Sequence, residues 1–258
     1  MIHATAVVDP RAKLASDVEV GAHCVIGAEV TIESGTRLLS HVVISGPTRV
    51  GARVEVHPFA VLGGPPQDRS YAGEATDLEI GDDVVIREHV TIHRGTRKDR
   101  GTTRIGPRTL LMVGVHVAHD VVIGESCIVA NATQLAGHVV IEDFVVIGGV
   151  AAFAPFVRVG ESAFVAARAG VEQDVPPFHI VQGDRARVRA LNRIGLERRS
   201  FSSASIDALE RAHREIYRSG KPLSVALDCF VEAELDPHVR KLVEFLRKHT
   251  TTPGPAVR

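Results

Sequence analysis

The chain has 258 residues, a formal net charge of −1 and no tryptophan, and 45% of its residues are hydrophobic. Its longest stretch without a charged residue or a histidine, residues 144–157, has 14 residues, too few for a membrane-spanning helix of about 20 residues. No basic segment precedes an apolar run at the N-terminus, as a secretory signal would require. Three widely spaced cysteines, Cys24, Cys127 and Cys229, favour neither a disulfide framework nor a cysteine zinc site, so we expect a soluble, cytoplasmic protein without a transmembrane segment.

A six-residue repeat occupies most of the chain, from Ile2 to the hexad that starts at Val171. Ile, Leu or Val begins each of 26 hexads except the one at Phe153, and the fifth position is almost always Ala, Val, Thr or Cys. An amphipathic helix would need apolar residues three and four apart, whereas extended segments with two inward positions per hexad fit the pattern. The repeat therefore predicts an all-β solenoid, a parallel β-helix, over residues 1–182.

Three hexads per turn would make an 18-residue coil, with successive coils about 4.8 Å apart. The rhythm breaks at residues 63–78 and again at 96–103, where glycine, proline and polar residues replace the regular hexads. Such segments must leave the packed interior as loops. Loops on a rigid solenoid are candidates for substrate contact.

The repeat stops at the turn 174–177, and residues 183–258 are predicted to form a small α-helical C-terminal domain. Ser203 or Ser205 would cap its first helix, which Gly220 would end. Two shorter helices are expected over residues 223–234 and 239–249, followed by a frayed end over 250–258.

The C-terminal segment is basic although the whole chain is nearly neutral. Residues 183–258 hold 15 Lys+Arg against 10 Asp+Glu, and six arginines lie between Arg185 and Arg199. This pattern is typical either of a solvated face or of a surface that binds an acidic partner or a phosphate.

Residues 110–120, LLMVGVHVAHD, lie near the middle of the repeat and contain the histidines that we consider for catalysis. His116 is sixth in its hexad, His119 is third, and the later His138 is fourth, so none occupies an inward position. The phase therefore predicts that all three point outward and cluster at one corner of the solenoid, where a general base and neutral hydrogen-bond donors could surround a hydroxyl.

Stacking predicts which residues lie beside His119. Gly137 follows it by one 18-residue coil, so we expect Gly137 and His138 on the next coil, within about 5 to 7 Å. Asp120 is the neighbour of His119 in sequence, and a contact between them requires a local bend. If that contact forms, the carboxylate would fix the histidine tautomer and stabilise the imidazolium.

Several segments together resemble one family. The hexads, HVAHD at residues 116–120, LAGHV at 135–139, DVPP at 174–177 and YRSG at 217–220 are similar to the UDP-N-acetylglucosamine O-acyltransferases, hexapeptide-repeat enzymes that begin lipid A biosynthesis. The resemblance covers essentially the whole chain. It implies a left-handed β-helix, a cytoplasmic homotrimer with active sites between neighbouring prisms, and transfer of an (R)-3-hydroxyacyl group from acyl carrier protein to the 3-hydroxyl of UDP-N-acetylglucosamine without a cofactor or a metal.

The resemblance also implies a role for each site residue. His119 would be the general base, Asp120 would orient it, and the Gly137 N–H would stabilise the oxyanion. The remaining residues would bind substrate: His116 and His138 the sugar and the acyl chain, Asp68 the acyl 3-hydroxyl, and Arg198 and Arg199, in an arginine-rich lid, the uridine diphosphate.

The sequence departs from the family pattern at three places. Ser70 replaces a lysine near the nucleotide sugar, and Ala154-Pro155 replaces a His-Gln pair at the sugar. Ala167 and Arg185 differ from the Gly and His of members that use long acyl chains. Acyl-chain length and the identity of the sugar, UDP-N-acetylglucosamine or an amino analogue, therefore stay open.

Three other functions fit parts of the pattern. A glucosamine N-acyltransferase of the same superfamily normally has a further domain before its hexads. A β-helix carbonic anhydrase would need His116, His119 and His138 to converge on zinc at about 2.0 to 2.1 Å. A non-catalytic scaffold would not need the combination of HVAHD and LAGH.

Overall fold

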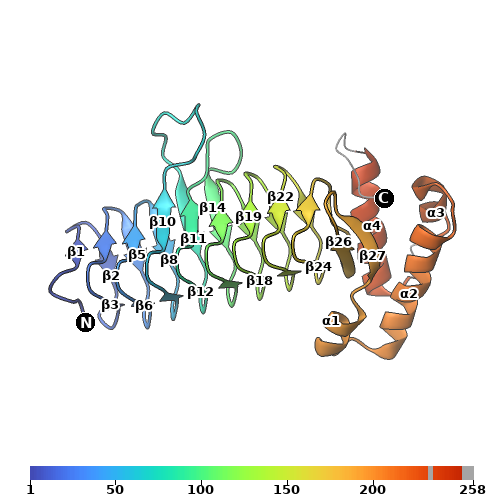
Figure 1. Ribbon diagram of the computed structural model, residues 1–258, viewed down its shortest axis with the longest axis horizontal. Helices are drawn as coiled ribbons and strands as arrows, with labels where there is room; N and C mark the ends of the chain where they lie inside the picture. The colour runs from blue at the N-terminus through green and yellow to red at the C-terminus, as the bar shows by residue number, and fades with distance from the viewer. Residues whose placement is uncertain (232–234, 252–258) are drawn as a thin grey trace.

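The structure is a computed structural model that describes residues 1–231 and 235–251. Most of these residues form a prism of short strands, wound into stacked coils whose long axis is the long axis of the molecule (Figure 1). Three sheets make the three faces of the prism, and their strands alternate in chain order. This is the predicted all-β solenoid, a left-handed parallel β-helix.

The strands group into three sheets within the described residues. One sheet contains β1 (Val7–Val8), β4 (Val25–Ile26), β7 (Val43–Ile44), β10 (Val61–Gly64), β13 (Thr91–His93), β16 (His116–Val117), β19 (Gln134–Leu135), β22 (Ala152–Phe153) and β25 (Gly170–Val171). The second contains β2 (Lys13–Leu14), β5 (Val30–Ile32), β8 (Thr48–Val50), β11 (Asp77–Ile80), β14 (Thr102–Ile105), β17 (Val122–Ile123), β20 (Val140–Ile141) and β23 (Arg158–Val159). The third contains β3 (Glu19–Val20), β6 (Arg37–Leu38), β9 (Glu55–Val56), β12 (Val85–Ile86), β15 (Leu110–Leu111), β18 (Ile128–Val129), β21 (Val146–Ile147), β24 (Phe164–Val165), β26 (His179–Gln182) and β27 (Arg187–Leu191).

Strand register gives the predicted 18-residue coil in the central part of the prism. His116 of β16 pairs with Gln134 of β19, and Gln134 pairs with Ala152 of β22. First-position residues such as Val117 and Leu135 are fully buried, because the first hexad position faces the interior of every coil. Stacking of these aliphatic side chains forms the long core of the prism.

The turns between strands bend at the fourth hexad position. Asp120 and His138, both in this position, have positive φ angles of 60° and 65°, a conformation that costs energy for residues other than glycine. The same conformation recurs at the fourth position along the prism. The repeat therefore fixes where each coil bends. At the bend, the side chain of the fourth residue points in a different direction than regular extended backbone would give it.

Two loops leave the prism and project on the same side of it (Figure 1). The first connects β10 to β11 and comprises residues 65–76, and the second connects β13 to β14 and comprises residues 94–101. The first loop is shorter than the predicted 63–78, because β10 extends through Gly64 and β11 begins at Asp77. The second is as long as predicted but begins and ends two residues earlier, because β13 ends at His93 and β14 begins at Thr102. Parallel pairing of β11 with β8 and β14 extends the regular structure into sequence that does not follow the hexad pattern.

Among the described residues, a hairpin and four helices follow the last coil. β26 pairs antiparallel with β27, so a strand occupies residues that we expected to belong to a helical domain. Gly183, with φ of 104°, allows the tight reversal because it has no Cβ. Within the described residues, the helices are α1 (Arg193–Arg198), α2 (Ser203–Arg218), α3 (Leu223–Asp228) and α4 (Pro237–Thr251).

The helix boundaries differ from the predictions in detail. Ser202, rather than Ser203 or Ser205, caps α2, because its side chain accepts a hydrogen bond from the Ser205 N–H. Gly220 follows the end of α2 with φ of 75°, as predicted. α1 was not predicted, α3 is shorter than expected, and the predictions for residues 232–234 and 252–258 lie outside the described residues.

The helices pack together at the end of the prism. Ile206 and Leu209 of α2 join Leu242 and Val243 of α4 in a cluster of buried apolar side chains, which holds the helices against one another. The three cysteines are free. Within the described residues no helix has the length and apolar composition needed to cross a membrane.

Candidate active site

The candidate site lies at one corner of the prism, where two turns stack on each other. His119 and Asp120 lie in the turn between β16 and β17, and Gly137 and His138 lie in the turn between β19 and β20. The His138 N–H donates to the His119 carbonyl at 3.1 Å. The 18-residue spacing thus places the four residues together, as predicted.

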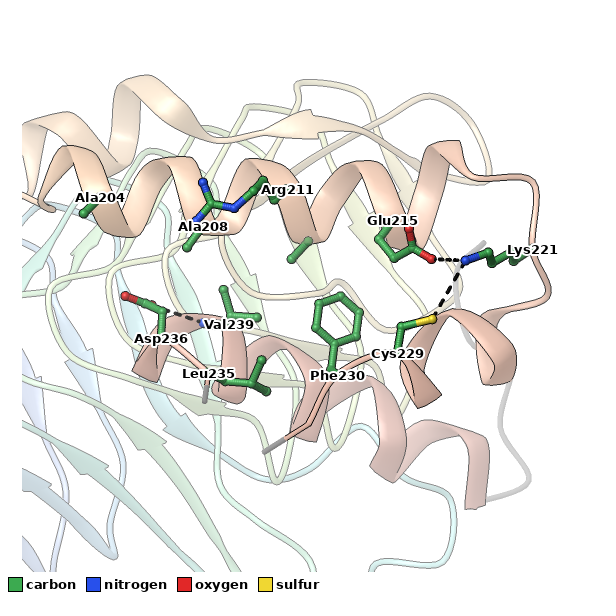
Figure 2. Close-up of a pocket in the computed structure, with 11 residues that line it drawn as sticks. Ala204, Ala208, Arg211, Glu215, Lys221, Cys229, Phe230, Leu235, Asp236 and Val239 are labelled. Carbon is green, nitrogen blue, oxygen red and sulfur yellow. Dashed lines mark hydrogen bonds and ion pairs between the residues drawn. The ribbon is translucent and has the colours of Figure 1, made fainter. Parts of the chain in front are cut away.

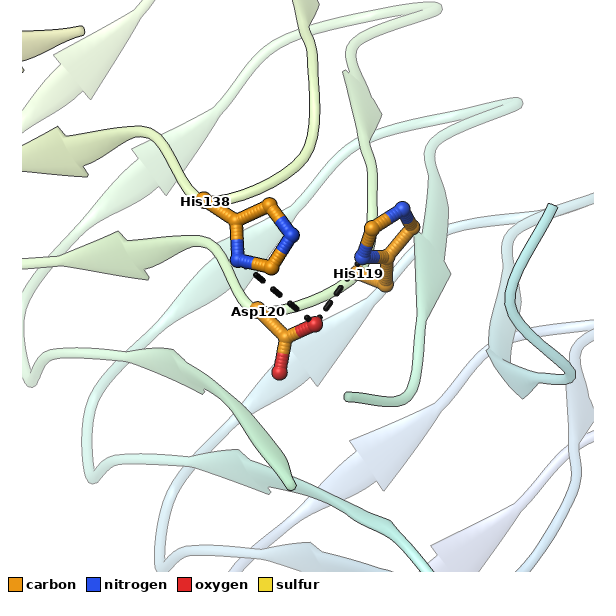
Figure 3. Close-up of side chains that lie close together, drawn as sticks. All are labelled: His119, Asp120 and His138. Atoms are coloured by element: carbon orange, nitrogen blue, oxygen red, sulfur yellow. Dashed lines mark hydrogen bonds and ion pairs between the residues drawn. The ribbon is translucent and has the colours of Figure 1, made fainter. Parts of the chain in front are cut away.

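His119 and Asp120 contact each other directly (Figure 3). The distance from His119 Nδ1 to Asp120 Oδ2 is 2.9 Å, and the positive φ of Asp120 provides the bend that the contact requires. The carboxylate accepts a hydrogen bond from the Nδ1–H, which leaves a lone pair on Nε2 of the neutral imidazole. The imidazole therefore holds the tautomer that a general base needs.

Asp120 is fully buried because the 94–101 loop covers it. The Thr96 hydroxyl donates to Asp120 Oδ2 at 2.6 Å, and the Thr96 N–H lies 3.0 Å from both carboxylate oxygens. On the other side, the Asp120 N–H donates to the Thr103 hydroxyl at 2.8 Å. Sequence reasoning missed Thr96 and Thr103, since neither is near Asp120 in the sequence.

Gly137 lies directly under the His119 imidazole. A Cβ at Gly137 would come within 2.6 Å of His119 Cε1 and 2.9 Å of Nε2, so any larger residue would displace the ring. The Gly137 N–H donates to no residue within the described part of the chain. An unpaired N–H beside the reactive nitrogen is suited to stabilising negative charge on a substrate oxygen.

His138 is held between a carboxylate and an aromatic ring. Its Nδ1 lies 3.0 Å from Asp99 Oδ2 in the 94–101 loop and 3.9 Å from Asp120 Oδ2. Phe156 stacks on the imidazole at 4.4 Å between ring centroids, with the planes 2° apart. The His119 ring meets the His138 edge at 5.0 Å. Sequence reasoning did not identify Asp99, because a contact made by a loop carries no local signal. It also missed Phe156, although Phe156 follows His138 by one 18-residue coil.

His116 does not belong to the corner cluster, contrary to our expectation. It lies on β16, on a flat face of the prism, because the sixth hexad position is in a strand and not in the turn. Its Nδ1 lies 2.8 Å from the Thr91 hydroxyl, and its ring meets that of His93 at 5.3 Å. Burial lowers the pKa of His116, so the ring is a neutral hydrogen-bonding group near neutral pH.

Asp68 lies in the 65–76 loop, away from the contacts that join His119, Asp120 and His138. Its Oδ2 pairs with Lys98 Nζ at 2.7 Å, and its Oδ1 accepts from the Ser70 hydroxyl at 2.9 Å. Hydrogen bonds from Lys98 and Ser70 hold the pKa of Asp68 well below its ordinary value. The pair joins the two loops, and Ser70 is engaged within the first of them.

Arg198 and Arg199 lie in and just after α1, beyond the last coil (Figure 1). Arg199 Nη1 pairs with Glu161 at 3.0 Å, and its guanidinium lies 3.6 Å from the centre of the Phe144 ring. Arg198 is exposed. Within one chain the arginine-rich segment therefore does not form a lid over His119, because α1 packs at the end of the prism.

One cluster in the described residues has the composition of a metal site. Ligand atoms of His119, Asp120 and His138 all lie within 4.8 Å of one another. Within one chain His116 does not join this cluster, since its Nδ1 bonds to Thr91 of the same sheet. The Asp120 carboxylate is already bound by Thr96 and His119, which favours a proton-transfer pair over a ligand set.

Comparisons with known proteins identify similar chains. A family model described as "Udp N-acetylglucosamine O-acyltransferase; Domain 2" matches residues 174–254. The structure of LpxA from Acinetobacter baumannii is 38% identical, with a TM-score of 0.93 over 100% of this chain and 99% of that one. LpxA from Bacteroides fragilis, a UDP-N-acetylglucosamine acyltransferase, is 37% identical, with a TM-score of 0.95 over 100% of both chains. The Arabidopsis UDP-N-acetylglucosamine acyltransferase is 31% identical, with a TM-score of 0.88 over 100% of this chain and 99% of that one.

Proposed function

The chain belongs to the UDP-N-acetylglucosamine O-acyltransferase family, and we propose that it transfers an (R)-3-hydroxyacyl group from acyl carrier protein to the 3-hydroxyl of UDP-N-acetylglucosamine in lipid A biosynthesis. The observation that carries this proposal is the hydrogen-bonded His119–Asp120 pair stacked on Gly137. The pair supplies a base and the glycine supplies an unpaired N–H, which are the two groups that acyl transfer to a hydroxyl requires.

In the proposed reaction His119 Nε2 removes the proton from the sugar hydroxyl as the oxygen attacks the thioester carbonyl. The new C–O bond makes a tetrahedral intermediate, whose negative oxygen accepts a hydrogen bond from the Gly137 N–H. The buried Asp120 carboxylate stabilises the imidazolium that forms. When the intermediate collapses, the C–S bond breaks and the thiolate of the carrier protein takes the proton from His119.

The remaining substrate contacts are proposed from the family resemblance. His138 and His116 would contact the acyl chain and the sugar, Asp68 would bind the acyl 3-hydroxyl, and Arg198 and Arg199 would bind the diphosphate. One chain does not bring these groups together, so we propose that they meet between neighbouring chains of a homotrimer. Phe156, which is 72% exposed beside His138, would be covered in such a cleft. The proposed donor and acceptor place the enzyme in the cytoplasm.

Product mass tests the reaction directly. Purified protein would be incubated with UDP-N-acetylglucosamine and a series of (R)-3-hydroxyacyl carrier proteins of different chain lengths. We expect an O-acylated nucleotide sugar with one preferred chain length. Acylation only of an amino analogue of the sugar would instead favour an N-acyltransferase, and the absence of any acylated sugar would refute the proposed function.

Replacing Gly137 with alanine should lower kcat by about 10²-fold, because a displacement of about 1 Å in a reacting group has an effect of that size. The added Cβ would lie 2.6 Å from His119 Cε1 and would push the imidazole away from its position. Steady-state kinetics would show a loss in kcat larger than any change in KM. The matched control is Gly27→Ala, whose Cβ would make an ordinary 3.4 Å contact with the Ile44 carbonyl. Equal activity of both variants would show that the imidazole does not need its place over Gly137.

A further inference from the structure

A cavity lined by arginines, called the basic cavity below, lies beyond the prism, between the C-terminal hairpin and α2. Its volume is about 350 Å³, and α2 reaches the hairpin where Arg218 Nη2 donates to the Arg189 carbonyl at 3.3 Å. Arginines from β27, α1 and α2 line it together with one histidine. The charged and titratable lining residues are Arg189, Arg193, Glu210, His213, Arg214 and Arg218.

The cavity carries more positive charge than its acids can neutralise. Arg193 pairs with Glu210 at 2.7 Å and with Glu197 at 2.9 Å. Arg189, Arg214 and Arg218 form no ion pair with a carboxylate in residues 1–231 or 235–251; Arg214 and Arg218 donate only to backbone carbonyls. Guanidinium groups gathered around one cavity repel one another, and an anion that they share removes that cost.

A hydrogen bond to the buried His179 determines whether the second ring nitrogen of His213 can donate or accept. His179 is fully buried, and its Nδ1 donates to the Pro177 carbonyl at 2.7 Å, so its Nε2 must be the acceptor in the neutral ring. His213 Nδ1 lies 3.1 Å from that Nε2 and must donate to it. The remaining nitrogen of His213 therefore accepts when the ring is neutral and donates when the ring is protonated.

The pKa of His213 depends on its burial and on the charged groups around it. Burial lowers the pKa of His179 to about 4 and keeps it neutral. Burial also lowers the pKa of His213, Arg218 and Arg214 lower it further, and Glu210 opposes them. Tyr217 packs on the same ring at 5.2 Å as an uncharged neighbour. A bound anion would offset the arginines and favour the protonated form of His213.

We propose that this cavity is a binding site for a phosphate-class oxyanion, held by Arg189, Arg214 and Arg218 and by the protonated ring of His213. Arginine forks match the oxygen geometry of phosphate and sulfate groups. The site is separate from the His119 corner, because it is built by β27 and α2 after the last coil. It does not depend on the proposed acyl transfer.

A neighbouring cavity provides the matched control. Figure 2 shows this larger cavity of about 650 Å³ between α2 and the segments around α3 and α4. Arg211 of α2 lines it, but Glu215 and Lys221 form an ion pair there at 2.6 Å, and Asp236 adds a further acid. Arg211 thus lies on the same helix as Arg214 without belonging to the basic cavity.

Calorimetric titration of the full chain with pyrophosphate tests the site. We expect saturable binding that weakens about tenfold or more in the double variant Arg189→Ala/Arg214→Ala, the size expected when charge-assisted hydrogen bonds are removed. Arg211→Ala should bind like the unaltered protein. Equal binding by the double variant, or no binding by the unaltered protein, would overturn the proposal. Binding of holo acyl carrier protein without any binding of pyrophosphate would also overturn it, and would assign the surface to an acidic protein.

Further titrations separate the sources of the anion. Inorganic phosphate, UDP and vesicles with or without an anionic phospholipid would each be compared in the unaltered protein and the double variant. If phosphate or UDP binds the unaltered protein more tightly than the double variant, the natural ligand is a free anion. If only anionic vesicles show this difference, the ligand is a lipid headgroup. Both results support the site. If the double variant binds anionic vesicles as well as the unaltered protein does, that result counts against the proposed site.

The pH dependence tests the role of His213. Sulfate stays fully ionised between pH 5.5 and 8, roughly the range in which an accessible histidine changes charge, so any change in its affinity comes from the protein. We expect sulfate to bind more tightly as the pH falls. His213→Asn keeps a donor toward His179 but cannot titrate, and it should flatten this dependence. If the affinity of His213→Asn for sulfate changes with pH as it does in the unaltered protein, His213 does not bind the anion.

Discussion

Replacing His119 with alanine is expected to lower kcat by about 10²- to 10⁴-fold, the usual contribution of a general base. The variant loses the imidazole whose Nδ1 is hydrogen-bonded to the buried Asp120 carboxylate and whose Nε2 points away from it (Figure 3). Substrate binding should change less than turnover, because the base acts mainly in the transition state. Steady-state kinetics with acyl carrier protein and UDP-N-acetylglucosamine as varied substrates would measure both effects.

His3→Ala is the matched control, since His3 is exposed in the first coil and its side chain bonds only to Thr5 among the described residues. Thermal unfolding of His119→Ala should stay close to that of the unaltered protein, because the ring lies at a corner outside the core. Full activity in this variant would show that another group is the base. If His119→Ala loses both activity and folded protein, His119→Asn, which keeps more of the packing, separates the two effects. A folded but inactive His119→Asn would support His119 as the base.

Asp120→Asn should lower kcat by roughly 10³-fold or more, as loss of the orienting carboxylate does in an analogous catalytic triad. In the variant the amide oxygen would face the Thr96 donors, since Thr96 offers only hydrogens to Asp120. The amide NH₂ would then face His119 Nδ1 and act as a donor. That interaction moves the imidazole proton to Nε2, where the ring can no longer remove the proton of the sugar hydroxyl.

Asp9→Asn provides the comparison, because Asp9 is a partly exposed carboxylate paired with Arg11 far from the site. Circular dichroism and thermal melting should show that Asp120→Asn keeps its fold, since the substitution preserves volume and removes a buried charge. Activity within a few-fold of the unaltered protein would show that His119 does not depend on this carboxylate for its tautomer.

The 94–101 loop connects the two halves of the corner. Thr96 binds the carboxylate that orients His119, and Asp99 binds His138, while Lys98 joins this loop to the first one through Asp68. A single short loop thus fixes both histidines and contacts the segment proposed to bind the acyl chain. Rigid support of this kind is what holds catalytic groups in productive geometry.

The amino-acid sequence by itself determined the prism and the neighbours of His119. Each hexad contributes the same inward positions, and with three hexads per turn each coil has 18 residues. Adding one coil to His119 then leads to Gly137 and to His138. Which residues of successive coils lie next to each other depends on the regular backbone and its register, and a sequence repeat specifies both. The family resemblance adds roles for the residues, and the comparisons confirm the family.

The tertiary structure alone decided how the corner is completed. The hexad count did not show that Asp120 would be fully buried, because a loop outside the repeat supplies Thr96 to cover it. The hexad count also did not show that His116 lies outside the cluster, or that the arginine-rich segment forms β27 and α1. These features arise from contacts between residues far apart in the chain, and their geometry depends on packing of the whole molecule, which no local pattern records.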